Sequence, residues 1–135
     1  MRTAIRYYSK FGHSKAMADV IGEVCQVGAQ PVSVPLAEPV DVLFLGAGIF
    51  LGKVNAKIGE FIRTLDPSQV GCVVCFGSSA IVDSPVPLLR KMLEERGIKV
   101  CDQSFSCLGS MGPVHAGHPN AEDLELLRSF VTSLK

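Results

Sequence analysis

Short runs of mostly apolar residues alternate along this chain with longer segments in which apolar residues recur every three or four positions. The longer segments place their apolar residues on one face of a helix. The short runs predict five strands, at residues 4–8, 32–34, 40–45, 70–76 and 99–108. Strands that alternate with helices in this way are joined by right-handed crossovers. We therefore expect a three-layer, doubly wound α/β fold with a parallel sheet covered by helices on both faces.

Residues with strong end preferences mark where the predicted helices begin and end. Gly28 and the Asp66-Pro67 pair are expected to end the first two helices, and Gly97 is expected to end the third. Ser84 is expected to cap the third helix, and Asn120 is expected to cap the last. These signals place four helices between and after the five strands.

Two prolines flank the shortest predicted strand. Pro31 precedes residues 32–34 and Pro35 follows them. Proline has no N–H to donate to a neighbouring strand, so it is tolerated best where one side of the strand is unpaired. We therefore expect this strand at a margin of the sheet.

Size and charge narrow the possible functions. The chain has 135 residues, 47% of them hydrophobic and 19% charged, which suits one domain over residues 1–135 with a sizeable core. Thirteen basic residues balance thirteen acidic ones, so no summed field attracts nucleic acid or an anionic membrane surface. No apolar run approaches the roughly 18 residues that suggest a membrane span. We expect neither a nucleic-acid partner nor a membrane partner.

The cysteines indicate a reducing compartment. Their number is odd and they lie mostly in apolar segments, at Cys25, Cys72, Cys75, Cys101 and Cys107. This pattern favours small buried side chains over a disulfide framework. The first residues enter a strand without the pattern of a secretory signal. We therefore expect a cytoplasmic protein without disulfides.

The turn after the first predicted strand could bind an anion. Open α/β sheets bind ligands beyond the carboxyl ends of their strands, where the strand order reverses. Residues 9–14, Ser-Lys-Phe-Gly-His-Ser, offer two hydroxyls, a glycine and backbone N–H groups at a helix N-terminus. An ordinary serine-capped turn is the alternative. The spacings of a Walker A loop and of Gly-x-Gly-x-x-Gly are absent, which disfavours a nucleoside triphosphate or NAD.

This segment resembles the first strand and FMN-phosphate loop of flavodoxins, which usually read Ser/Thr-x-Thr-Gly-x-Thr. Ser9, Gly12 and Ser14 match that pattern, whereas Phe11 replaces a hydroxyl residue. The resemblance implies the strand order 2-1-3-4-5. It also implies that FMN is the cofactor and that its phosphate contacts Ser9, Lys10, Phe11, Gly12, His13 and Ser14.

Two further segments resemble the flavodoxin loops that contact the flavin ring. The loop after the third strand has Phe50 at a frequent aromatic position, with Gly48 and Leu51 where proline and tryptophan are common. Alternatively, Phe50 packs beneath its loop and residues 76–80 form an ordinary polar turn. The resemblance implies that the ring contacts Ala47, Gly48, Ile49, Phe50 and Leu51 from one loop, and Phe76, Gly77, Ser78 and Ser79 from the other.

The resemblance implies an FMN-binding electron-transfer protein that passes electrons between redox partners, with no catalytic residue of its own. One alternative is an FMN-dependent NAD(P)H:quinone-type oxidoreductase, and another is a flavodoxin-shaped interaction module that has lost its cofactor. The chain is neutral, with a pI near 6.8, so electrostatic steering to a basic reductase is weak. A redox partner protein and a small-molecule electron acceptor therefore both stay open. No spacing of histidines and carboxylates predicts a metal site.

Overall fold

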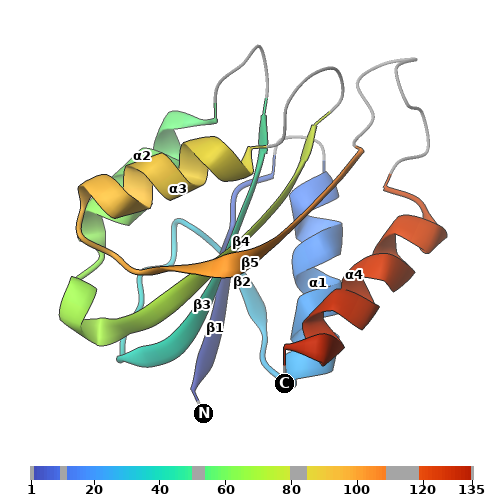
Figure 1. The fold of residues 1–135 in the computed structure, drawn as a ribbon, viewed down its shortest axis with the longest axis horizontal. Coiled ribbons are helices and arrows are strands. Elements are labelled where there is room, and N and C mark those ends of the chain that lie inside the picture. The colour runs from blue at the N-terminus through green and yellow to red at the C-terminus, as the bar shows by residue number, and fades with distance from the viewer. Residues whose placement is uncertain (1, 10–11, 50–53, 80–84, 109–118, 135) are drawn as a thin grey trace.

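The five predicted strands form one parallel sheet in the order β2-β1-β3-β4-β5. The computed structural model describes residues 2–9, 12–49, 54–79, 85–108 and 119–134 (Figure 1). The predicted fold class and strand order are confirmed. The strands are β1 (Thr3–Tyr7), β2 (Ala29–Pro31), β3 (Val40–Ile49), β4 (Val70–Ser79) and β5 (Val100–Leu108).

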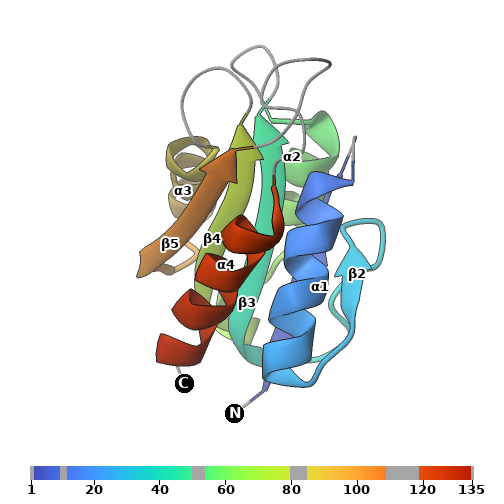
Figure 2. The same ribbon diagram turned by 90° about the vertical axis from the view of Figure 1, so that its right-hand side faces the viewer.

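Four α-helices cover the sheet as two outer layers (Figures 1 and 2). Helices α1 and α4 lie on one face, and α2 and α3 lie on the other. Among the described residues, no helix is both long and apolar enough to cross a bilayer. The elements are α1 (His13–Cys25), α2 (Ala56–Thr64), α3 (Val86–Glu95), α4 (Ala121–Ser133) and the short 3-10 helix η1 (Pro67–Gln69).

Successive residues of the central strands enter two separate cores. Leu43 and Leu45 of β3 pack with the buried residues of α2 and α3, whereas Phe44 between them packs with those of α1 and α4. In β4, Val73 and Val74 divide between the two cores in the same way. Both strands read as continuous apolar runs because neither face of the sheet meets water.

The second strand lies at the sheet edge, as its prolines predicted, but earlier in the chain than expected. It ends at Pro31 instead of spanning residues 32–34. The Val32 N–H still donates to Tyr7 O at 2.8 Å, and the Val34 N–H then donates back to Pro31 O at 3.0 Å. That turn carries the chain away from β1, because residues whose N–H groups close a local turn cannot also continue the ladder.

The third and fourth strands are longer than predicted. They continue through residues 46–49 and 77–79, which were expected to be loops, and pair in parallel up to Ile49↔Ser79. A Cβ at Gly46 would overlap the Phe76 ring, so glycine is what lets that ring lie across the neighbouring strand. The loop interpretation is wrong because each strand supplies the other with backbone partners.

The ends of the helices follow the predicted signals in part. Gly97 has a φ of +74° just after α3, as expected of a helix-ending glycine. Helix α1 ends instead at Gln26, with a φ of +59°, so the expected role of Gly28 is wrong. The turn folds back so closely that a Cβ at Gly22 would lie 2.6 Å from Val27 O. Ser84, the predicted cap of α3, lies outside the described residues.

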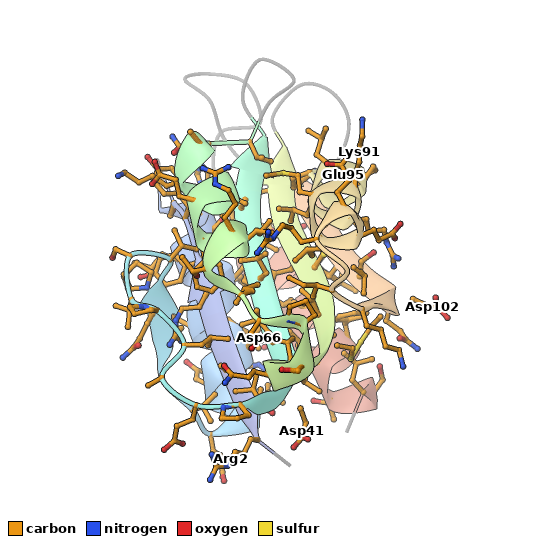
Figure 3. The ribbon with its side chains drawn as sticks, turned by 90° about the vertical axis from the view of Figure 1, so that its left-hand side faces the viewer. Arg2, Asp41, Asp66, Lys91, Glu95 and Asp102 are labelled. Carbon is orange, nitrogen blue, oxygen red and sulfur yellow. A yellow bond between two sulfur atoms is a disulfide. The ribbon has the colours of Figure 1, made fainter. Side chains whose placement is uncertain are left out.

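The amino ends of the strands are tied together by charged groups from the first residues of the chain. The Arg2 backbone N–H donates to Asp41 Oδ2 at 2.7 Å, and the Arg2 guanidinium donates to Glu38 Oε2 at 2.8 Å. Figure 3 shows Arg2 and Asp41 at this end of the molecule. Both side chains of the Arg2–Glu38 ion pair are largely exposed, so the pair contributes little to stability.

One disulfide contradicts the expectation from the cysteine pattern. Cys72 of β4 is bonded to Cys101 of β5, and their Cα atoms are 5.7 Å apart. The sequence could not indicate this pair, because its proximity depends on how β4 and β5 are aligned. Cys75 agrees with the expectation, since its thiol is free and buried.

Asn120 caps α4 as predicted, which leads to a stability test. Its Oδ1 accepts from the Asp123 N–H at 2.9 Å, and Asp123 Oδ2 accepts from the Asn120 N–H at 2.9 Å. We expect Asn120→Ala to lower the free energy of unfolding in urea by about 1 kcal/mol, because it removes this reciprocal cap. Ser129→Ala, at an exposed position of the same helix, is the control and should leave stability unchanged or slightly raised. Equal values for the two variants would contradict the capping role.

Candidate functional site

The candidate site lies where the strand order reverses. The chain passes from β1 to β2 on one side and from β3 to β4 on the other, so the crossover helices leave in opposite directions. The carboxyl ends of β1, β3 and β4 lie at the same sheet edge, and α1 begins beside them (Figure 2). The Tyr8 N–H donates to Gly46 O at 3.0 Å, which holds the end of β1 against β3. This edge is the position at which open α/β sheets bind ligands.

Ser9 carries the clearest sign that something binds here. Its Oγ is buried and has no hydrogen-bond partner. A buried hydroxyl left unpaired costs roughly 1–3 kcal/mol relative to a paired one. Such a group at the start of a turn between β1 and α1 is available to an acceptor or donor from outside the chain.

The start of α1 offers donors beside Ser9. The helix is capped by Gly12, which has a φ of +86° and no side chain to accept from the first N–H groups. Ser14 is 2% exposed and lies in the first turn of the helix, after His13. No acidic residue stands in that turn, so the positive end of the helix dipole is not offset there. Ser9 thus follows the end of β1, and Gly12, His13 and Ser14 form the start of α1, whereas Lys10 and Phe11 lie outside the described residues.

The predicted ring-contact residues lie mostly in paired strand backbone. Ala47 faces Gly77 and Gly48 faces Ser78 across β3 and β4. Ala47 is fully buried and Ser78 is 4% exposed, so this part of the edge is tightly packed. Ile49 and Ser79 are the last residues of their strands. Phe50 and Leu51 lie outside the described residues, and their contacts with a ring stay predictions.

Phe76 lies within β4, as expected from the predicted strand at residues 70–76, and a contact of its backbone with the flavin stays a prediction. Its side chain is fully buried in the core under α1 and α4. The ring is therefore packed beneath the edge and is not available to a ligand. Its place in the core follows from strand alternation, because Val74 two residues earlier enters the same core.

Arg6 is a residue near the site that the sequence patterns did not single out. It is 8% exposed, and its Nε donates to Val34 O at 2.8 Å while one terminal nitrogen donates to Pro35 O at 3.2 Å. Burial lowers the pKa of Arg6, but a guanidinium stays protonated at neutral pH. The sequence did contain a signal for this buried residue, because Arg6 is a charged residue inside an apolar strand. The backbone of Arg6 lies three residues, about 10 Å of extended strand, before Ser9.

Neither a metal site nor a reactive thiol at Cys75 is supported by the described parts of the chain. Within those parts, no three His, Cys, Asp or Glu side chains are placed to hold a metal ion. Burial raises the pKa of the Cys75 thiol to about 12, so it stays protonated and unreactive at neutral pH. The arrangement is suited to holding an anionic ligand with hydroxyl and backbone donors.

Solved structures of similar fold are numerous. The structure of a flavodoxin from the domain Archaea has a TM-score of 0.80 at 20% identity, covering 99% of this chain and 96% of that one. Oxidised flavodoxin 2 from Bacillus cereus has a TM-score of 0.73 at 20% identity, covering 98% and 97%. A short-chain flavodoxin associated with a non-canonical PDU bacterial microcompartment has a TM-score of 0.73 at 16% identity, covering 99% and 97%.

These similarities define the class of fold. The chain has a flavodoxin-like fold along nearly its whole length, with the strand order 2-1-3-4-5. No protein-family model matches the sequence, and no curated protein matches it either. At identities of 20% or below, the similarity establishes the fold, and the function has to be argued from the site.

The close packing of β3 and β4 at this edge can be tested with two glycines. A Cβ at Gly77 would overlap the carbonyl oxygen of Ala47, whereas a Cβ at Gly48 would lie 3.7 Å from the nearest atoms of Ser78. We expect Gly77→Ala to lower the free energy of unfolding by about 2 kcal/mol, because the backbone of a central strand must shift. Gly48→Ala is the matched control and should change it by less than about 0.5 kcal/mol. Denaturant unfolding of both variants measures the difference, and equal losses would contradict the described packing.

Proposed function

We propose that this chain binds FMN at the carboxyl edge of its sheet and serves as an electron carrier between redox partners. The observation that carries the proposal is the buried Ser9 Oγ without a partner, three residues before Gly12, which caps α1 without a side-chain hydrogen bond. A phosphate oxygen there would accept from the Ser9 hydroxyl and from backbone N–H groups of the helix. Phosphate is the group that this set of donors suits best.

The flavin ring would lie at the paired carboxyl ends of β3 and β4. Gly48 and Ser78 lie opposite each other, and the absence of a side chain at Gly48 lets a flat ligand approach the backbone. The backbone of paired strands is rigid, so its N–H and C=O groups would meet a ring in fixed positions. The proposed ring contacts are therefore backbone contacts from this edge, together with the predicted stacking of Phe50.

The chain's own part in such a function is binding and orientation. Ser9 and the start of α1 would hold the phosphate, the buried guanidinium of Arg6 would add positive charge, and the strand ends would exclude water from one side of the ring. FMN, when bound, supplies reversible electron transfer. Neutral net charge makes steering to a strongly charged partner weak, so either a redox protein or a small-molecule acceptor fits.

Substitution of Ser9 tests the phosphate site through two effects of opposite sign. We expect Ser9→Ala to raise the stability of the FMN-free protein by about 1 kcal/mol, because it removes an unpaired buried hydroxyl. The same variant should bind FMN roughly tenfold more weakly, because one hydrogen bond to phosphate is lost. Urea unfolding measures the first effect, and titration of flavin fluorescence measures the second. Ser129→Ala should show neither, and a Ser9 variant that keeps full affinity would contradict the assignment.

Binding and turnover assays separate the three candidate functions. Protein mixed with FMN should shift the flavin spectrum and quench its fluorescence, and riboflavin, which lacks the phosphate, should bind more weakly. A carrier accepts electrons only through a second protein, whereas an oxidoreductase with bound FMN oxidises NAD(P)H with a quinone by itself. Absence of any flavin binding would overturn the proposal and favour an interaction module.

A further inference from the structure

The edge strand β5 contains an irregularity that has no role in the candidate site. Val73 of β4 pairs with Val100 of β5, but Cys75 pairs with Ser104. One residue of β4 therefore lies opposite three residues of β5, and β5 bulges over residues 101–103. This bulge lies near the amino end of the strand, away from the carboxyl edge.

A disulfide holds the bulge from one face of the sheet. Cys72 pairs in register with Val42, which packs against the core under α1 and α4, and Cys101 packs against the same core. Both sulfur atoms therefore lie on that face, joined as a disulfide. The Cα separation of 5.7 Å is ordinary for bonded cysteines.

An arginine holds the same bulge from the other face. One terminal nitrogen of Arg90, from α3, donates to Cys101 O and to Asp102 O, the latter at 2.9 Å. These bonds involve backbone oxygens and not sulfur, so reduction of the disulfide does not remove either the donor or the acceptors. The bulge therefore has a support that is independent of the redox state of its cysteines.

The bonded cysteines are less buried than their neighbour in the strand. Cys72 and Cys101 are each half-buried, whereas Cys75, in the same strand as Cys72, is fully buried. Asp102, next to Cys101, is exposed at the outer edge of the sheet (Figure 3). Cys72 lies six residues before Ser78, about 20 Å along an extended strand. The pair therefore lies apart from the candidate flavin site, in residues that keep part of their surface exposed.

We propose that Cys72 and Cys101 form a redox-active pair that exchanges two electrons with an external dithiol at the amino end of the sheet. One thiolate of the dithiol attacks a sulfur of the pair, which breaks the Cys72–Cys101 bond and forms a mixed disulfide. The second thiolate of the dithiol then displaces the remaining cysteine. The dithiol leaves as a disulfide, and its two protons end on the thiols of Cys72 and Cys101. The exchange is separate from the proposed function, because it uses other residues at the opposite end of the strands.

The test is titration of the native chain with reduced and oxidised dithiothreitol, followed by alkylation and peptide mass mapping. Dithiothreitol should expose Cys72 and Cys101 to alkylation while the far-ultraviolet circular dichroism stays native, and Cys75 should stay unmodified. The melting temperature of the reduced protein should fall by about 10 °C, because the 29-residue separation is no longer closed by a bond. Oxidised dithiothreitol should restore both the bond and the melting temperature.

Two variants serve as controls. Cys101→Ser should melt at the same temperature with and without reductant, whereas Cys25→Ser should respond as the unchanged chain does. Reduction only after unfolding would overturn the proposal and leave a purely structural disulfide. Failure of the bond to form under oxidised dithiothreitol, or loss of the native spectrum on reduction, would overturn it as well. None of these readouts depends on FMN, so the result stands apart from that of the flavin assays.

Discussion

The pairing of β3 with β4 is the contact on which the rest of this structure depends. The register runs from Val40↔Val70 to Ile49↔Ser79, which makes these two strands the long centre of the sheet. Because alternate residues enter opposite cores, the same pairing fixes where both helix layers pack. Its continuation to the carboxyl edge also determines the candidate site, because backbone that is already paired presents its atoms in fixed positions.

Much of the fold could be predicted because it follows from local patterns. A few neighbouring residues determine each buried strand and each helix face. The same holds for two of the helix ends, at Gly97 and Asn120. The extension of the strands to Ile49 and Ser79 was missed for a physical reason. Glycine and serine are common in turns, and only the presence of a partner strand makes the extended conformation favourable for them.

The candidate site could be predicted less completely, because it depends on contacts between distant residues. The edge and the turn at Ser9 follow from topology, but the unpaired state of its hydroxyl is visible only in three dimensions. The buried role of Arg6 depends on carbonyl groups contributed by residues after β2. Likewise, the bond between Cys72 and Cys101 requires the bulge that alters the β4–β5 register.

The two outer strands of the sheet, β2 and β5, are both poor templates for pairing with another sheet. Strand β2 has three residues and ends at Pro31, and β5 is interrupted by a bulge whose carbonyl groups Cys101 O and Asp102 O are bound by Arg90. Neither margin offers a long, straight row of unpaired backbone groups to another sheet. These two margins therefore protect a concentrated solution of this protein against edge-to-edge aggregation.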